Sequence, residues 1–199
     1  MIDLTIPVEA SRAKRLRAGT NETHDRLDKA IMQSAPFESR ERYGLFVSVQ
    51  YLFHREIDAL YENAVLDTML PDLGGRRRLW LVAQDLNDLG LSMPNVNTAP
   101  VFARGAEVDI PAALGWLYVA EGSNLGAAIL LKEAARLGLN DGFGARHLAS
   151  APEGRGLHWK TFTAALDALL LSDPEEERVI AGARAAFARV QSLVGEAFA

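Results

Sequence analysis

The sequence predicts an all-α protein packed as a compact helical bundle. Apolar residues recur at helical spacing along almost the whole chain, and no segment shows the alternation of apolar and polar residues that is typical of a strand. Hydrophobic residues make up 49% of the 199 residues, which is enough to fill one sizeable core. We therefore expect one domain that covers residues 1–199.

The first half of the chain is predicted to form four helices. Helical periods cover residues 12–31, 39–61, 65–70 and 76–90. Pro36 stands just before the second helix, and Gly90 ends the fourth. Proline, asparagine and serine are frequent after Gly90, so we expect a loop over residues 92–106.

The second half is predicted to form three helices, over residues 111–137, 160–171 and 173–198. Pro111 fits the first turn of the first of these helices, and Gly138 ends it. The segment 140–156 is rich in turn formers, so we expect a connector there with one short helical piece. The glutamates that follow Pro174 suit the positive amino end of the last helix.

His24 lies on the first predicted helix, one turn before Asp28. Positions four apart share a helix face, so one ring nitrogen can bind a metal or a flat metal-bearing ligand while Asp28 holds the other. A histidine with an acid four residues later is also common on solvated helices. This segment alone therefore leaves a plain surface role open.

Gly122 and Gly126 stand four residues apart in the long apolar helix predicted over residues 111–137. Each costs about 1 kcal/mol relative to alanine inside a helix, so the pair needs a reason. Without side chains the helix can lie against a flat ligand, and a local kink is expected. A tight crossing with another helix through small residues would explain the pair equally well.

Together these two segments resemble the haem oxygenase family, and its bacterial branch most closely. The series Leu16, Thr20, His24 and Asp28, followed by Glu-Gly-Ser-Asn-Leu-Gly at residues 121–126, stands in the family's order and at about its separation. The segments 40–53, 143–148 and 159–162 are also similar to the bacterial enzymes. The resemblance covers essentially the whole chain from residue 16 onward.

The resemblance implies a haem-oxygenase-like bundle that holds haem between the first helix and a glycine-kinked distal helix. His24 would be the axial ligand of the iron, and therefore the metal ligand. Asp28 stands where the family usually has the longer glutamate, which leaves open a link to His24 through water. Gly122, Ser123 and Gly126 would form the catalytic distal surface.

Ser123 occupies the place where the mammalian enzymes have a catalytic aspartate, an acid that bacterial relatives also lack. Proton delivery would then fall to ordered water and Ser123. Lys132 resembles a bacterial lysine that pairs with a haem propionate, and Arg17 stands where relatives have basic or amide groups. Arg184 and Arg189 are further cationic candidates, although a solvated helix face explains them as well.

The activity implied by the resemblance is oxidative cleavage of haem by O2 to biliverdin, carbon monoxide and Fe²⁺, with haem as both substrate and cofactor. The sequence has no flavin or nicotinamide motif, so the electrons would come from an external ferredoxin or flavoprotein reductase. The products would serve iron acquisition or supply a bilin-binding photoreceptor. A non-catalytic haem carrier or sensor on the same fold is the alternative, followed by a helical binding module without haem.

Composition excludes several other classes. The chain has no cysteine, so disulfides, thiolate haem ligation and Cys-based zinc or iron–sulfur sites are ruled out. A net charge of −5 without a basic stripe argues against nucleic acid as a partner. We expect a cytoplasmic protein without a membrane partner, because residues 1–7 do not form a signal peptide and no apolar run approaches a membrane span.

The remaining histidines and the tryptophans are given structural roles. His54, His147 and His158 lack partners at metal-ligand spacing, so we expect them to be structural or exposed. Trp80, Trp116 and Trp159 are predicted to lie in the core rather than against haem. No Glu-x-x-His pair occurs, which excludes a di-iron carboxylate bundle.

Overall fold

The computed structural model describes residues 11–199, and these residues form seven α-helices and three short 3₁₀ helices, with no strand among them. The prediction about residues 1–7 lies outside this range. The elements are α1 (Arg12–Gln33), α2 (Arg40–Ile57), η1 (Asp58–Glu62), α3 (Ala64–Met69), η2 (Gly74–Arg76), α4 (Leu79–Asp88), α5 (Ile110–Arg136), η3 (Arg146–Leu148), α6 (Arg155–Ala168) and α7 (Asp173–Ala197). The predicted all-α class is confirmed.

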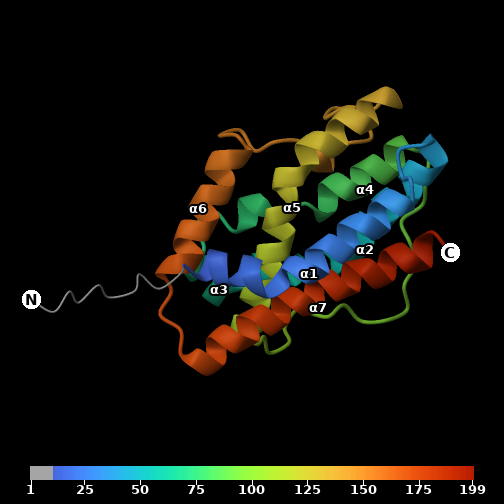
Figure 1. The fold of residues 1–199 in the computed structure, drawn as a ribbon. Coiled ribbons are helices and arrows are strands. Elements are labelled where there is room, and N and C mark those ends of the chain that lie inside the picture. The colour runs from blue at the N-terminus through green and yellow to red at the C-terminus, as the bar shows by residue number, and fades with distance from the viewer. Residues whose placement is uncertain (1–10) are drawn as a thin grey trace, which may run out of the picture.

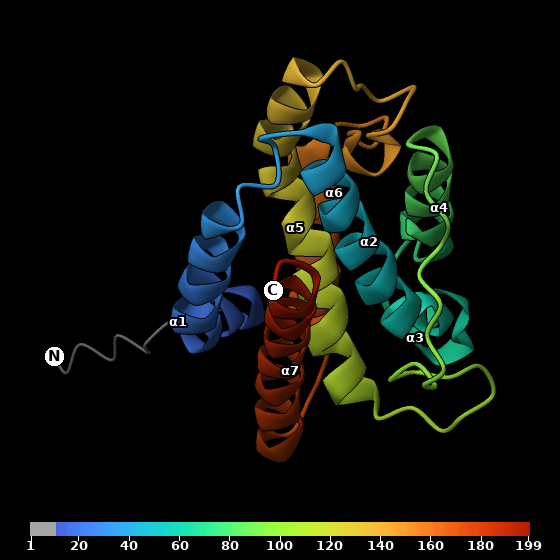
Figure 2. The same cartoon turned by 90° about the vertical axis from the view of Figure 1, so that its right-hand side faces the viewer.

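α7 is the element around which the other long helices gather. α1, α2 and α5 all pack against it, and α6 packs against both α1 and α5 (Figure 1). α1 and α5 therefore share α7 as a common support, and Figure 2 shows α1 standing to one side of α5. Both helices also have exposed positions, among them His24 on α1 and Gly126 on α5.

Capping residues explain why the helices begin where they do. Ser11 accepts a hydrogen bond from the backbone N–H of Lys14, and Ser39 does the same for Arg42. Asp109 caps α5, and Ser172 forms a reciprocal capping box with Glu175 at the start of α7. At the other end of α5, Gly138 has a φ of +76°, a left-handed conformation in which glycine is favoured.

Four predicted helix boundaries differ from the structure by three residues or more. The second helix ends at Ile57, and the chain continues as η1 rather than as the same helix. The fourth begins at Leu79 instead of residue 76, because Arg77 is extended (ψ 131°) and Arg76 enters a buried ion pair. α6 begins at Arg155, five residues earlier than expected, and ends at Ala168.

The end of α6 has a clear cause in tertiary contacts. Leu169, which follows the helix, is extended (ψ 140°), and its carbonyl oxygen accepts a hydrogen bond of 2.9 Å from Arg12. Arg12 also donates to the carbonyl of Leu166 in the last turn. A side chain more than 150 residues earlier in the chain thus satisfies carbonyls that would otherwise be orphaned at this helix end.

α5 corrects the expectation that no segment is long enough to span a membrane. By length and composition alone this helix, with a mean hydropathy of 1.2 over its most apolar window, is long and apolar enough to do so. Half of that window is buried inside the protein, as in a core helix. Its buried positions pack against α7 and α6.

Candidate functional site

His24 and Asp28 form a pair on the exposed surface of α1. Nδ1 of His24 lies 3.2 Å from a carboxylate oxygen of Asp28, so the shorter acid reaches the ring without an intervening water. The side chains are 55% and 62% exposed, while Leu16 and Thr20 on the preceding turns are buried. The ring of Phe187 on α7 meets the imidazole edge-on at 5.7 Å between centroids. This contact and Asp28 fix the imidazole, and no interaction among the described residues uses its Nε2.

A hollow of about 410 Å³ runs along α1, lined by Lys14, Arg17, Ala18 and Asn21. Residues 14, 17, 21, 24 and 28 follow the three-and-four spacing of one helix face, so the hollow lies on the side that bears His24. Arg17 has no hydrogen bond or ion pair among the described residues. The hollow therefore presents a free guanidinium two turns before the histidine.

Tyr118 of α5 lies within the electrostatic reach of Arg17. Burial raises the pKa of the Tyr118 phenol, and the positive charge of Arg17 partly opposes that rise. The Tyr118 ring also contacts Trp159 of α6, at 5.5 Å between centroids. Sequence reasoning missed this residue, although its position four residues before Gly122 and eight before Gly126 gives the signal.

Gly122 and Gly126 do not lie at a helix crossing. A β-carbon at Gly126 would meet no other atom within 4 Å, and one at Gly122 would make ordinary contact, at 3.5 Å, with Trp159. The close helix crossing of α5 uses a different glycine, Gly115, which lies against α7. The crossing alternative for the Gly122 and Gly126 pair is therefore wrong, and α5 is helical without interruption through both glycines.

The surface around Gly126 is open and apolar. Leu125 and Ile129 are 43% and 67% exposed, which is unusual for large aliphatic side chains on a helix that is otherwise buried. Ser123 is also exposed, and its hydroxyl donates to the carbonyl of Ala120 at 2.7 Å. A flat apolar ligand that covered this surface would meet backbone at Gly126 and a hydroxyl oxygen at Ser123.

The four candidate cations fall into two groups. Lys132 is exposed, and like Arg17 it makes no ion pair or hydrogen bond among residues 11–199. Arg184 donates to the carbonyl of Gly19 at 2.8 Å, and Arg189 pairs with the buried Glu56 at 2.7 Å. Lys132 and Arg17 are therefore the cations that remain available to an anionic ligand group.

A buried polar cluster fixes α5 at the residue before Gly122. The Glu121 carboxylate lies 2.9 Å from Arg76, 3.3 Å from the Tyr61 hydroxyl and 3.4 Å from Nε2 of His158. The side chains of Glu121 and Arg76 are 1% and 2% exposed. The cluster joins η1, η2 and α6 to α5, which holds the glycine-bearing helix in place from its covered side.

His54, His147 and His158 are all buried, in agreement with their predicted structural roles. Burial lowers the pKa of His54 to about 3, so this ring is neutral. Nδ1 of His147 lies 2.7 Å from Asp85, and Nδ1 of His158 lies 2.7 Å from Glu153. Trp80 contradicts its core assignment, because it is 56% exposed.

Within the described part of the chain, no group of three or more His, Cys, Asp or Glu side chains could hold a bare metal ion. The residues present instead fit a metal that is held in a flat, apolar prosthetic group. His24 offers one free ring nitrogen, and Gly126, Leu125 and Ile129 offer an open apolar surface. Arg17 and Lys132, which have no ion pair among residues 11–199, offer positive charge for the acidic edge of such a ligand.

Comparison with known proteins agrees with this fit. The family model described as "Heme oxygenase" matches residues 10–196. The chain is 43% identical over 188 residues to heme oxygenase PigA of Pseudomonas aeruginosa, covering 94% of this chain and 93% of the relative. The NO- and CO-bound heme oxygenase of Neisseria meningitidis has a TM-score of 0.88 and 43% identity, with 94% of this chain and 92% of that chain covered. A heme oxygenase of Leptospira interrogans shares the fold, with a TM-score of 0.75, 21% identity and coverage of 94% and 100%.

Proposed function

The chain belongs to the haem oxygenase family and is a haem-degrading enzyme, and we propose that it converts haem to biliverdin, carbon monoxide and Fe²⁺. In this proposal His24 is the residue that would hold the haem iron. The observation that supports this assignment is the exposed His24–Asp28 pair, in which Asp28 occupies Nδ1 and leaves Nε2 free. A carboxylate on Nδ1 fixes the tautomer and makes Nε2 a better donor to a metal.

When bound, haem supplies the iron that binds O2 and the porphyrin ring that is oxidised. The apolar side chains of Leu125 and Ile129 would cover the ring and exclude water. Gly126 would let the α5 backbone approach the ligand closely, because the space before it is open.

Ser123 is the group that we propose for proton delivery. Its hydroxyl proton is committed to the carbonyl of Ala120, at 2.7 Å, so its oxygen can accept a hydrogen bond from a water molecule. Such a water would stand beside Gly126 and pass protons to the distal side. A serine in this role replaces the aspartate of the mammalian enzymes.

Two cations are proposed to seat the propionates of haem. Arg17 and Tyr118 would bind one end of the acidic edge, because the guanidinium and the phenol lie within electrostatic reach of each other. Lys132 lies about 15 Å further along α5 than Gly122, given the 1.5 Å rise per helical residue, and would compete for the same edge. Their balance would decide the in-plane rotation of haem and hence the biliverdin isomer.

The electron donor is proposed to be a separate protein, a ferredoxin or a flavoprotein reductase, because the sequence has no flavin or nicotinamide motif. The products suit iron acquisition, or bilin supply to a photoreceptor. We also propose that residues 1–199 form one domain and that the protein is cytoplasmic. The packing of α5 against α6 and α7 supports a core role for this helix.

The alternative of a non-catalytic haem carrier or sensor is not kept. It depended on Asp28 and Ser123 as departures from the family pattern, and Asp28 reaches His24 directly. The identity of 43% to heme oxygenase PigA over nearly the whole chain also places this protein with enzymes.

The test of the proposal is to add haemin and then ascorbate or a ferredoxin system, and to follow the absorption spectrum. We expect the Soret band to disappear and the broad red absorption of biliverdin to replace it. An oxygenated haem complex that persists under reducing conditions would contradict the proposal.

A further inference from the structure

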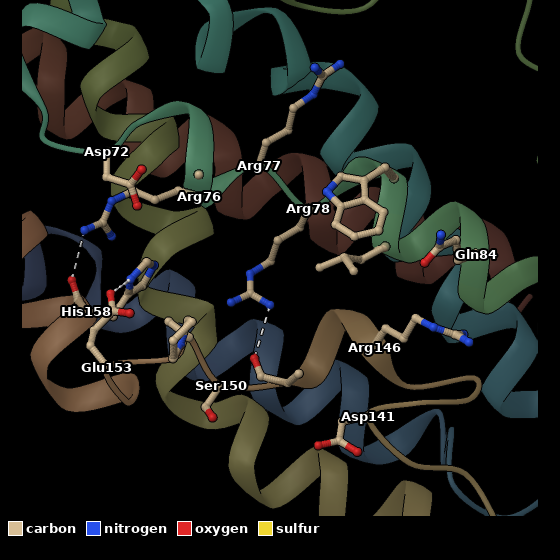
Figure 3. A pocket seen from close by; sticks show the side chains of 16 residues that line it. Asp72, Arg76, Arg77, Arg78, Gln84, Asp141, Arg146, Ser150, Glu153 and His158 are labelled. Carbon is tan, nitrogen blue, oxygen red and sulfur yellow. Dashed lines mark hydrogen bonds and ion pairs between the residues drawn. The ribbon is translucent and has the colours of Figure 1, made fainter.

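A second cavity of about 390 Å³ lies on the other side of the buried cluster at Glu121. It is bounded by η2, the start of α4, the loop at residues 149–153 and α6 (Figure 3). None of the residues proposed above to hold haem lines it. Four arginines do: Arg76, Arg77, Arg78 and Arg146.

Three of these arginines are neutralised by carboxylates. Arg76 pairs with Glu121 at 2.9 Å, and Arg77 pairs with Asp58 and Glu62 at 2.5 Å each. Arg146 pairs with Asp88 and also lies 3.5 Å from Asp85. Their charges are therefore already balanced within the protein.

Arg78 differs from the other three because no carboxylate within the described residues lies at ion-pair distance from it. Its Nη1 donates to the carbonyls of His147, at 2.7 Å, and Ala149, at 3.3 Å. Its Nε is buried without an acceptor, and no hydrogen bond in the described chain uses Nη2. Figure 3 shows the Arg78 side chain extended into the middle of the cavity. The negative charge of Glu121 acts on Arg78 from beyond ion-pair distance, but burial outweighs it and lowers the pKa of Arg78. A bound anion would therefore stabilise the charged guanidinium.

The amino end of α4 adds to the positive potential at the same place. Arg78 is the N-cap residue, it provides no side-chain cap, and the first turn of α4 contains no acid. Acidic side chains are the groups that usually stabilise this end of a helix. Three consecutive arginines are found there instead.

The acids that line the cavity limit what can bind. Glu153 is engaged by Nδ1 of His158 at 2.7 Å, and Asp72 lies against Gly75. Figure 3 shows Asp72 and Asp141 on two sides of the cavity, away from the Arg78 guanidinium. They would repel a large polyanion but leave room for a small anion at Arg78.

We propose that this cavity is a binding site for a small oxyanion, a carboxylate or a phosphate group, with Nη2 of Arg78 as its principal donor. The planar guanidinium presents N–H donors in the geometry that such oxygens accept. Trp80 lines the same cavity and is 56% exposed, which gives an aromatic ring on the anion a flat surface to contact. The proposal is independent of haem chemistry, so it can fail while the proposed oxygenase function stands.

The test uses isotopically labelled full-length protein without haem, titrated with sodium phosphate and, separately, with sodium benzoate at an ionic strength held constant with chloride. The signals followed are the Arg78 Nε–H, the Trp80 indole N–H and the Ser150 amide, all at the cavity wall. We expect saturable shifts of these three signals with at least one anion. Saturation by phosphate identifies a phosphate site, and saturation by benzoate identifies a carboxylate site.

The variant Arg78→Gln should weaken the binding at least tenfold. Arg136→Gln is the matched control, because Arg136 is 75% exposed and pairs with Glu133 on the surface of α5, and it should bind as the wild type does. Equal affinity in Arg78→Gln, or no saturable shift of the three wild-type signals with either anion, would overturn the proposal. The wild-type titration decides the matter even if Arg78→Gln does not fold.

Discussion

Gly115 on α5 and Gly182 on α7 lie face to face at a crossing so close that neither position has room for a β-carbon. A β-carbon on Gly115 would overlap the carbonyl oxygen of Val179, and one on Gly182 would overlap that of Ala112. Both glycines are buried inside long helices, where glycine costs about 1 kcal/mol relative to alanine. The close packing of the two central helices offsets that cost.

The first prediction follows from this crossing. Gly115→Ala and Gly182→Ala should each destabilise the protein by about 1–3 kcal/mol, because the backbones must separate to admit a methyl group. The matched control is Gly195→Ala on α7, where a β-carbon would meet no atom within 4 Å, and it should gain about 0.5–1 kcal/mol. Urea denaturation midpoints measure all three. A wild-type midpoint in Gly115→Ala would show that the crossing is not tight in solution.

The contrast between Gly115 and Gly126 also shows what the sequence could predict. Helical periodicity, Pro111 and Gly138 were sufficient for the limits of α5 to within one residue. Which glycines serve packing depends on a partner helix about 70 residues later in the chain, and no local pattern contains that information. The pair of Gly122 and Gly126 was noticed through its spacing, but its open surroundings required the structure.

Some residues of the candidate site could likewise be predicted from the sequence, and others could not. Spacing along one helix found His24, Asp28 and the distal glycines, because those residues are related by helical geometry alone. The contact of Tyr118 with Trp159, the Arg76–Glu121 ion pair and the hydrogen bonds of Arg78 to η3 and the residue after it all join distant segments. The early start predicted for the fourth helix failed for the same reason, since Arg76 is drawn into a buried pair with α5.

The second prediction concerns His24. His24→Ala should fold with nearly wild-type stability, because the side chain is 55% exposed and alanine favours a helix. Haem added to this variant should lose the spectrum of a five-coordinate histidine complex, and added imidazole should restore it. The measurements are thermal unfolding and the absorption and resonance Raman spectra of the haem complex. An unaltered histidine spectrum in His24→Ala would mean that another residue is the ligand.

Gly126 gives the third prediction. Gly126→Leu should preserve or raise the melting temperature, since the space before Gly126 is open and leucine is a better helix former. The same side chain should crowd the proposed distal surface, so haem affinity and biliverdin formation should both fall at least tenfold. Gly195→Leu, at a helical glycine of α7 that is also open, is the control and should keep both. Full activity together with unchanged haem affinity in Gly126→Leu would place the ligand elsewhere.

The fourth prediction is a pH dependence of stability that involves His158. The carboxylate of Glu121, 3.4 Å from Nε2, raises the pKa of His158 against the opposing effect of burial, and the hydrogen bond with Glu153 raises it further. A folded-state pKa above the unfolded value of about 6.5 means that the stabilising contribution is complete below pH 6.5 and is lost as the pH rises through the folded pKa. The difference in unfolding free energy between wild type and His158→Gln should therefore be larger at about pH 5.5 than at about pH 8.5.

His54 also contributes to the pH dependence of stability, so the effect of His158 must be measured as a difference between wild type and His158→Gln. Burial lowers the pKa of His54 to about 3, so its contribution has the opposite sign and falls as the pH drops below about 6.5. Both wild type and His158→Gln retain His54, and its effect cancels in their difference. A difference that is constant between the two pH values would show that His158 does not gain a proton more easily in the folded state.

The last prediction is the isomer of biliverdin, which depends on Arg17 and Lys132. Both are unpaired in the described structure, and haem is nearly symmetric apart from its vinyl and propionate edges, so the cation that holds the propionates sets which meso carbon is cut. We expect the α isomer to dominate, because Arg17 on α1 lies within electrostatic reach of the Tyr118 phenol on α5 and the two offer complementary donors. A partly exposed ion pair contributes about 0–1 kcal/mol, so removing one should change the isomer ratio by about fivefold at most.

Arg17→Ala should therefore raise the minor isomers, while Lys132→Ala and the control Arg136→Ala should leave the α isomer dominant. Chromatographic separation of the products decides between the two cations: a dominant β or δ isomer in the wild type that reverts to α in Lys132→Ala would assign the seating of haem to Lys132 instead of Arg17.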